Sequence, residues 1–585
     1  MTDSALRYRP PGLYRESDKN RYTPLSLPET GIPGFVGITE RGPTNKPVKV
    51  TSVEQFIKIF GNLSIDAYLA PAVDGFFTNG GAACYIVRVA NLSGIASGKG
   101  ARHAGALLKN HAGKTAVQVT ARSEGSWANE LKISFRSLPP KNQTLLTMDL
   151  AEDSTSASIR STHGFQRGTI VRFNDEEKEG FVSLDSVETK LIKWGVPMGL
   201  AFNSDVPTTL EPVEFEVEIE LGEKKERFSN LSSSVASGSY FARVINERSQ
   251  WIQILDLLPD TPSNGDLPAQ ALREPLLGGR DGIDTLTPSD FIGDDRGPGN
   301  RFGLKALEFI EEIDLLCIPD LMWCLGHTMG FRTEKHVEIV QHEMLSQAER
   351  CRDRVAILEL PEKSDYQDAL SWRTLFDSSY GALYFPWLEI ERDGQLQTVP
   401  PSGHVAGIIS RTDQEIGTHG PPANQDIRGV VDVAQPLSPD DAGMLNTDCV
   451  NAIRPMNARG IRVWGARTLS SDPMLRYINV QRVLGTLVRA LRKDLQWVVF
   501  EPNGPALWKI ITRDITLFLT KLWRMGMFRG NTPEDAFYVK CNEETNSEEE
   551  RDAGRVVVEI GVSPVRPTEY IVFRIRQELE EPDLT

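Results

Sequence analysis

The apolar residues of this chain follow two patterns, one typical of strands and one typical of helices. These patterns alternate on both sides of a long polar stretch at residues 93–275. Continuous apolar runs, typical of buried strands, are separated by segments whose apolar residues recur every three or four positions, as in helices. Strands are predicted at Ile32–Ile38, Cys84–Val89, Leu315–Ile318, Val355–Leu360 and Ala382–Trp387, and helices at Ser52–Phe60, Tyr68–Thr78, Phe302–Glu312, Thr333–Ala348 and Tyr366–Phe376. This alternation predicts one α/β domain with a mainly parallel sheet, built from residues 32–92 plus 276–470.

The polar stretch, residues 93–275, has a different pattern. Ser, Thr and Gly interrupt short runs in which apolar and polar residues alternate, as at Thr115–Ala121, Leu131–Phe135 and Val213–Leu221. A period of two with frequent turn residues is typical of antiparallel strands. We therefore expect a β-rich domain inserted into the α/β domain.

Helical spacing returns at Asn479–Gln496, where two stripes run along the predicted helix. The apolar stripe consists of Val480, Leu484, Leu487, Leu491 and Leu495, and the polar stripe of Arg482, Thr486, Arg489 and Lys493, with Arg492 beside it. An ordinary surface helix with its charges in water has the same pattern. The alternative is a basic surface that binds an acidic partner. The net charge of −16 favours this alternative, because positive charge is concentrated on one helix of an acidic chain.

The two ends of the chain predict extended segments. Residues 1–31 are rich in Pro, Arg and Tyr and contain too few aliphatic residues to fold alone, which predicts an extended arm. An apolar helix is expected at Pro505–Met527 and a solvated acidic loop at Glu543–Asp552. The segments Arg555–Val562 and Glu569–Arg576 are rich in β-branched residues and predict strands. A strand near a free terminus pairs within its own domain or with a neighbouring molecule.

Length and charge argue for several domains and against some classes of function. A chain of 585 residues is too long for one hydrophobic core, so we expect several domains. The acidic composition argues against nucleic-acid binding, and no apolar run is long enough for a membrane span. Six scattered cysteines and the absence of an apolar segment near Met1 favour reduced thiols and assembly in the cytoplasm. A particle would then leave the cell by another route, such as lysis, or be anchored to a membrane through other components.

No set of residues predicts catalysis. His336 and His342 have the wrong spacing to share a helical face, and Cys324-x-x-His327 lacks a second pair of zinc ligands. The segment Ser402-Gly-His404 lacks the strand–turn–helix context of a nucleophile elbow. We therefore expect no catalytic, cofactor-binding or metal-binding residues.

A series of short motifs follows in order along residues 10–90 and 275–580. They are Pro11–Tyr14, Gly34–Gly37, Glu40–Pro43, Phe76–Gly81, Tyr85–Val89, Gly417–Asn424, Leu445–Asn446, Val450–Arg454, Gly460–Leu469, Tyr477–Val480, Gln496–Asn503 and Val562–Tyr570. In this order they resemble the sheath proteins of contractile phage tails and of the related contractile injection systems.

The resemblance implies a multi-domain α/β protein of mixed α+β character. Its expected parts are an arm at 1–31, the discontinuous α/β domain, the inserted outer domain, and a tube-facing α+β domain at 471–585. Family subunits stack as hexameric rings around an inner tube, with baseplate and terminal cap proteins as further partners. They contract to drive the tube through a target envelope.

Family subunits also exchange their terminal arms with neighbouring copies. The resemblance thus implies tube contacts at Arg482, Arg489, Arg492 and Lys493. It implies inter-subunit strand exchange at Leu13, Tyr14, Val556, Val557, Val558, Ile560, Ile571, Phe573 and Ile575. An injection system is the favoured setting. The sheath of a phage virion and a cytoplasmic α/β enzyme with an inserted β domain are the alternatives.

Overall fold

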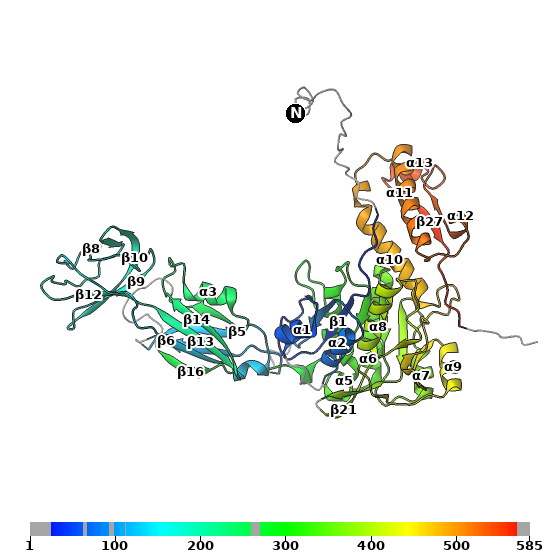
Figure 1. Ribbon diagram of the computed structural model, residues 1–585, viewed down its shortest axis with the longest axis horizontal. Coiled ribbons are helices and arrows are strands. Elements are labelled where there is room, and N and C mark those ends of the chain that lie inside the picture. The colour runs from blue at the N-terminus through cyan, green and yellow to red at the C-terminus, as the bar shows by residue number, and fades with distance from the viewer. Residues whose placement is uncertain are drawn as a thin grey trace, which may run out of the picture.

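The computed structural model describes residues 25–61, 67–92, 99–110, 113–258, 270–392 and 394–569. Figure 1 shows an elongated molecule with an α/β body, from which β-rich units extend to one side. A smaller C-terminal domain, coloured orange to red, lies above the body. Helices and sheets are both present in several units, so the predicted multi-domain α/β fold is confirmed.

A nine-stranded sheet forms the centre of the body. Its strands, in spatial order, are β2 (Val48–Val50), β3 (Cys84–Arg88), β1 (Pro33–Gly37), β17 (Leu315–Cys317), β18 (Val355–Leu358), β19 (Gly381–Phe385), β24 (Val450–Met456), β25 (Gly460–Val463) and β22 (Gln425–Asp426). The six strands from β3 to β24 pair in parallel, and the edge strands are antiparallel. Strands from both sides of the 93–275 stretch lie in this sheet, with β1 directly beside β17.

Helices cover both faces of this sheet, because successive residues of a buried strand point to opposite faces. Leu315 and Leu316 of β17 accordingly belong to different apolar clusters. One face carries α1 (Val53–Phe60), α2 (Leu69–Thr78) and α8 (Ser402–Glu415). The other carries α4 (Pro288–Ile292), η4 (Gly303–Leu307), α5 (Asp320–His327), α6 (Glu334–Cys351), α7 (Tyr366–Arg373) and α9 (Pro439–Thr447).

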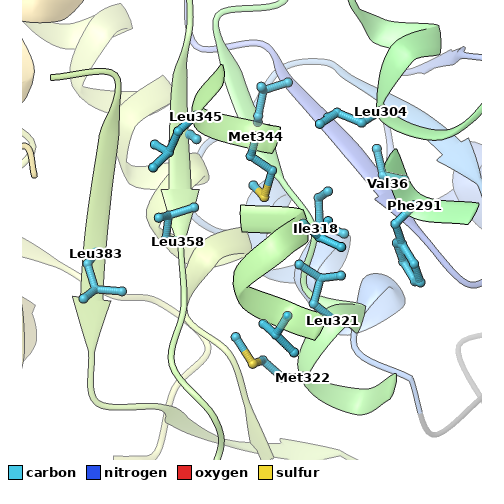
Figure 2. Close-up of a cluster of buried hydrophobic side chains, with 14 of the residues drawn as sticks. Val36, Phe291, Leu304, Ile318, Leu321, Met322, Met344, Leu345, Leu358 and Leu383 are labelled. Carbon is cyan, nitrogen blue, oxygen red and sulfur yellow. The ribbon is translucent and has the colours of Figure 1, made fainter. Parts of the chain in front are cut away.

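Figure 2 shows the apolar cluster on the face that carries α5 and α6, where side chains of helices pack against side chains of strands. Met344 and Leu345 extend from α6, and Leu321 and Met322 from α5. A further short sheet lies at the edge of the body, and its strands are β21 (Gln395–Val399), β20 (Leu388–Arg392) and β23 (Asp432–Val433).

The β-rich stretch forms two units with separate apolar clusters. The unit nearer the body is a two-sheet sandwich. One sheet contains β14 (Lys224–Leu231), β13 (Phe215–Leu221), β6 (Lys132–Ser137) and β16 (Ala271–Pro275). The other contains β15 (Ile252–Asp256), β5 (Thr115–Ala121) and β4 (Gly105–Lys109), with α3 (Phe241–Arg248) alongside.

The outer unit is inserted between two paired strands of the sandwich. Strands β6 and β13 are antiparallel neighbours, and the chain between them forms a six-stranded sheet at the far end of the molecule in Figure 1. Its strands are β7 (Thr144–Leu145), β12 (Thr209–Pro212), β9 (Ile170–Asn174), β10 (Glu179–Glu188), β11 (Leu191–Trp194) and β8 (Ser156–Ser158). The sequence predicts a single inserted domain here, because the turn-rich pattern is the same in both units.

The C-terminal domain packs two long helices against a small sheet. Its elements are α10 (Ile478–Asp494), η5 (Gln496–Val498), α11 (Pro505–Arg524), α12 (Pro533–Ala536), β26 (Phe537–Lys540), α13 (Glu548–Asp552) and β27 (Glu559–Val562). Side chains of α10, α11 and β26 form its apolar cluster. We call this set the C-terminal cluster.

Three predicted elements differ from the structure. The helix predicted at Phe302–Glu312 is only the 3-10 turn η4, and the carbonyl groups of Leu307, Glu308 and Ile310 that follow it accept hydrogen bonds from Arg354. The acidic loop contains α13, whose first turn is capped by Ser547. The strand predicted from Arg555 begins only at Glu559.

Within the described residues, no helix is both long and apolar enough to cross a bilayer. In the same ranges, no group of three or more His, Cys, Asp or Glu side chains could hold a metal ion. All six cysteines are free and buried.

Candidate assembly site

Helix α10 joins the body to the C-terminal domain. Its first residue, Ile478, packs in the cluster on the α8 face of the large sheet. Val483, Leu487 and Ala490 pack in the C-terminal cluster. Of the apolar stripe predicted on this helix, Val480 and Leu487 are buried, Leu491 and Leu495 pack against the C-terminal cluster, and Leu484 is half-buried.

The polar stripe of α10 is largely buried as well. Arg482 and Arg489 are only 5% and 4% exposed. Arg482 forms two hydrogen bonds of 2.5 Å to the carboxylate of Asp413 in α8, and its Nη2 lies 2.7 Å from Oδ2 of Asp314. Nη2 of Arg489 lies 3.5 Å from the same Asp314 oxygen. The prediction that these arginines belong to an exposed basic surface is wrong, because carboxylates of the body neutralise them in the interior.

The same carboxylate binds the chain where it enters the body. Oδ2 of Asp314 accepts a hydrogen bond of 2.9 Å from the amide of Gly31, and Oδ1 accepts one of 2.7 Å from the amide of Ile32. Gly31 has φ +72°, and a Cβ atom there would lie 2.6 Å from the Cα of Ser410, so the site requires glycine. We call Asp314, Asp413, Arg482 and Arg489, with these two amides, the N-terminal anchor.

Charge is distributed unevenly within this anchor. Burial alone raises the pKa of Asp314, but the charges of Arg482 and Arg489 hold it below its ordinary value. Burial is the stronger influence on Asp413, whose pKa is raised although it binds Arg482. Burial also acts to lower the pKa of Arg482, but the charges of Asp413 and Asp314 raise it overall, so its guanidinium stays charged.

Before Gly31 the described chain follows α10 toward its C-terminal end. The amide and hydroxyl of Ser26 donate hydrogen bonds of 2.7 and 3.1 Å to Oδ2 of Asp494. Leu25 and Leu27 pack against the C-terminal cluster. From Arg482 to Asp494 the helix rises about 18 Å. The segment thus binds the helix directly at Ser26, and at Gly31 and Ile32 it is joined to the helix through Asp314, which binds Arg482.

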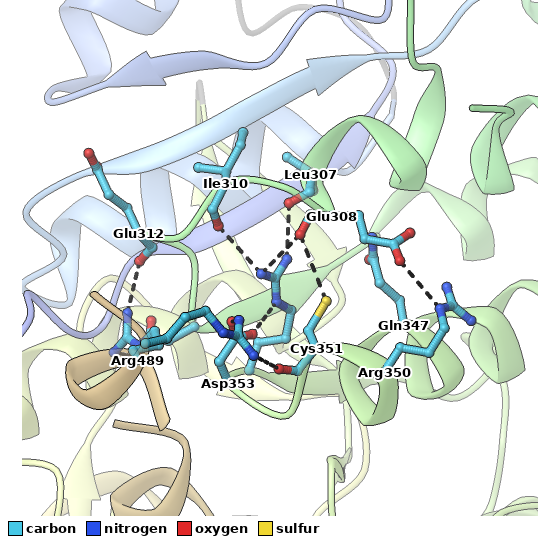
Figure 3. Close-up of polar contacts among 12 residues, drawn as sticks. Leu307, Glu308, Ile310, Glu312, Gln347, Arg350, Cys351, Asp353 and Arg489 are labelled. Carbon is cyan, nitrogen blue, oxygen red and sulfur yellow. Dashed lines mark hydrogen bonds and ion pairs between the residues drawn. The ribbon is translucent and has the colours of Figure 1, made fainter. Parts of the chain in front are cut away.

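The C-terminal half of α10 contacts the body through the side chains of Arg489 and Arg492. Arg489 donates to the carbonyl of Glu312 at 3.1 Å, as Figure 3 shows. Arg492 lies 3.0 Å from Oδ2 of Asp353, and 48% of its side chain is exposed. Lys493 is exposed. Of the four predicted tube-contact residues, Arg492 and Lys493 are therefore the two at the surface of the described chain, and their contact with a tube stays a prediction.

The residues predicted for strand exchange divide into two groups. Leu13, Tyr14, Ile571, Phe573 and Ile575 lie outside the described residues. Val556, Val557 and Val558 precede β27, and Ile560 lies within it. Side chains of Val556, Val558 and Ile560 pack against the C-terminal cluster.

Strand β27 pairs with β26 of its own chain, with Ile560 opposite Val539. Among the described residues these two strands form a sheet of their own, so each has an outer edge with no strand beside it. Two strands alone form a marginal sheet, and open edges accept further strands.

After β27 the chain returns to the body and is fixed there a second time. Nδ2 of Asn479 in α10 donates a 3.0 Å hydrogen bond to the carbonyl of Val565. Glu569 then receives two hydrogen bonds from the guanidinium of Arg467, of 2.9 and 2.6 Å, and one of 3.1 Å from the hydroxyl of Tyr477. We call Arg467, Tyr477 and Glu569 the C-terminal anchor. In Figure 1 this segment descends from the C-terminal domain along the body.

Glu569 remains ionised in this setting. Burial alone raises its pKa, but the hydrogen bonds and the charge of Arg467 hold the pKa below its ordinary value. The sequence motifs contain both Arg467 and Glu569, but their pairing is not visible from a spacing of 102 residues. Asp314 and Asp413 had no sequence signal at all.

Two family models match adjacent stretches of the chain. The phage tail sheath protein central domain matches residues 306–469, and the phage tail sheath C-terminal domain matches residues 470–578. The boundary between them falls just before α10. Both anchors lie within the matched stretches, apart from the Gly31 and Ile32 amides.

Individual proteins give the same result. The chain is 26% identical over 300 residues to a prophage major tail sheath protein of Pseudomonas aeruginosa, which covers 49% of this chain and 72% of the relative. It is 26% identical over 187 residues to the tail sheath protein of Escherichia phage P2, covering 31% and 45%. The fold is similar to the helical sheath of the anti-feeding prophage in its contracted state. That match has a TM-score of 0.52, 17% identity, and coverage of 97% of this chain and 99% of the other.

Proposed function

This chain belongs to the phage tail sheath proteins, and on that basis we propose that it is the structural subunit of a contractile sheath. Copies of it would stack as hexameric rings around an inner tube, between a baseplate and a terminal cap. The resemblance found in the sequence is therefore confirmed at the level of the family.

One structural observation carries the proposal. The chain is fixed to the body at Gly31 and Ile32 on one side and at Glu569 on the other. Between these points, β26 and β27 form a two-stranded sheet with open edges. Segments 1–24 and 570–585 of neighbouring copies supply the missing strands in our proposal, by backbone pairing at those edges. Force applied to segment 1–24 is then transmitted to the body through Gly31 and Ile32, and force applied to segment 570–585 through Glu569.

Contraction requires no catalytic step in this scheme. Subunits held in an extended lattice by the tube and the baseplate are released at the baseplate, and turn as nearly rigid bodies into a shorter, wider lattice with larger interfaces. A gain of a few kcal/mol per subunit, summed over on the order of a hundred subunits, makes the change irreversible. The exchanged segments keep neighbouring copies joined during the turn.

Contacts with the tube must break during contraction, which favours solvated ion pairs of low stability. We assign this contact to Arg492 and Lys493, which lie at the end of α10. The buried Arg482 and Arg489 instead hold α10 to the body.

The sheath belongs either to an injection device or to a phage virion, and a different relative supports each alternative. The likeness in fold to the anti-feeding prophage sheath favours an injection device. The relationship to the tail sheath protein of phage P2 favours a virion. Neighbouring genes distinguish them: capsid and terminase genes indicate a virion, whereas genes for an AAA+ ATPase and effectors indicate an injection device.

Truncation of the arms tests the proposal. Variants lacking residues 1–24 or 570–585 keep both anchors, so we expect them to fold with the melting temperature of the full chain. We expect them to form no sheaths when expressed with tube and baseplate proteins and viewed by negative-stain electron microscopy. The full chain, expressed in parallel, is the control and should form cylinders. Cylinders of normal length from either truncated variant would overturn the strand-exchange scheme.

A further inference from the structure

The loop between α10 and α11 presents one aromatic side chain to solvent. Phe500 is 102% exposed, and Val499 beside it is 62% exposed. The residues just before them behave differently, because Trp497 and Val498 pack against the C-terminal cluster. The change from packed to fully exposed occurs within one short apolar run.

The backbone of Phe500 is in a conformation that a bulky residue rarely adopts. Its φ is +72°, in the left-handed region where a Cβ atom meets the backbone. Glycine or asparagine adopts this conformation more easily. Strain of this kind persists only where the surroundings impose it, and such positions are concentrated at functional sites.

The surroundings of Phe500 do impose its position. The amide of Glu501 donates to the carbonyl of Val498 at 3.1 Å, which closes a turn around Phe500. Asn503 then ties the loop to two other segments, since its Oδ1 accepts from Nε1 of Trp508 and its Nδ2 donates to the carbonyl of Arg555, both at 2.9 Å. The backbone that carries the ring is thus braced, so little backbone entropy is lost when the ring is buried.

We propose that Phe500 is an anchor residue that each subunit inserts into an apolar site on a second copy of this chain. This inference deepens the proposed function and rests on it. Aromatic side chains that are preorganised and become fully buried dominate binding at protein interfaces. A strong apolar contact suits the permanent contact between copies and is unsuited to the tube, whose contacts must break.

The position of the loop supports the same partner. The packed part of the loop shares the C-terminal cluster with Leu25 and Leu27, where the described chain begins. Ser26 also binds Asp494, six residues before Phe500, so the described chain begins near the loop. In this proposal, a copy that pairs with segment 1–24 lies close to Phe500. The tip carries no cation for an acidic tube surface.

Photo-crosslinking at position 500 identifies the partner. Replacement of Phe500 by p-benzoyl-phenylalanine keeps an aromatic ring on the same loop. Irradiation of assembled sheaths should join two copies of the 65.0 kDa chain, and peptide mass spectrometry should show chain-to-chain links. The same probe at Leu517, which is 64% exposed on α11, is the matched control and should give at least tenfold less dimer. Links from position 500 to the tube protein, or no link above that control, would overturn the proposal.

A substitution separates assembly from folding. Phe500→Asn relieves the backbone strain, so the melting temperature should be equal to or above that of the full chain, while the yield of sheaths should fall at least tenfold. Phe500→Leu keeps an apolar side chain and should retain more assembly. If Phe500→Asn assembles as well as the wild-type chain, the proposed role of Phe500 is refuted while the proposed sheath function stands. If the wild-type chain itself forms no sheath, the proposed function fails instead.

Discussion

The two anchors fix the two ends of the chain in different ways. The N-terminal anchor is enclosed, since the side chains of Asp314 and Arg482 are 5% and 3% exposed. The C-terminal anchor is partly open, because 18% of the Glu569 side chain is exposed. The first joins four parts of the fold, namely α8, α10, the residue before β17 and the chain at Gly31 and Ile32, whereas the second attaches only the last described residue to the body.

This difference has a mechanical meaning. Removing one partner of a buried ion pair leaves an uncompensated charge in the interior, which costs far more than loss of a contact that water can replace. The N-terminal anchor therefore belongs to the permanent structure of the subunit. We expect low pH, or force applied to the C-terminal segment, to open the C-terminal anchor without unfolding the body.

The largest effect should follow from Arg482→Ala. This change leaves Asp413 buried without its guanidinium partner and removes the nearer cation from Asp314, so we expect a loss of about 3–5 kcal/mol in the free energy of unfolding. Urea unfolding followed by tryptophan fluorescence measures it. Arg492→Ala is the matched control on the same helix and should cost at most about 1 kcal/mol, because Arg492 is half exposed and Asp353 keeps Arg354 at 2.8 Å. Equal losses in the free energy of unfolding of the two variants would mean that the buried Arg482 stabilises the subunit no more than the half-exposed Arg492.

A smaller, local effect should follow from loss of charge at Glu569. Because the folded-state pKa of Glu569 is lowered, its contribution to stability is complete above the ordinary value of 4.5 and is lost as the pH falls through the folded value. Hydrogen exchange should show the amide of Val565 losing protection as the pH falls below the ordinary value of 4.5, after correction for intrinsic rates.

The variant Glu569→Gln provides the control for this titration. It should lose about tenfold in protection at neutral pH, which corresponds to about 1.4 kcal/mol, and it should show no further loss over the acidic range. The amide of Ile32, on the enclosed anchor, should stay protected until the body unfolds. Simultaneous loss at Val565 and Ile32 would mean that the two anchors open as one unit.

The smallest effect on stability should come from charge reversal at the surface. We expect Lys493→Glu to change the free energy of unfolding by less than about 0.5 kcal/mol, because the side chain is exposed. Its effect should instead be on tube binding, measured by co-sedimentation with purified tubes. Lys509→Glu on the exposed side of α11 is the matched control. Tube binding that is the same for both variants would remove Lys493 from the proposed contact.

Much of the body could be predicted because its signals are local. Ser52 caps α1 as its position before an apolar helical pattern indicates, and the runs at Leu315 and Val355 form buried parallel strands. The helix at α10 was also predicted to within a few residues. Its basic stripe was misinterpreted, because spacing shows that arginines share a helical face but not what lies opposite. The carboxylates that bury Arg482 come from positions 168 and 69 residues away.

By itself the sequence determined the spacing of apolar residues in the helices and strands, the β-rich insertion, the apolar stripe of α10 and the family. These follow from the spacing and identity of nearby residues. Only the tertiary structure decided which cations are buried, which anchor is open, that the insertion is two units, and that Phe500 stands free while Trp497 packs. The reason is physical: the burial and charge state of a side chain depend on groups brought to it from distant parts of the chain, and no local pattern records that approach.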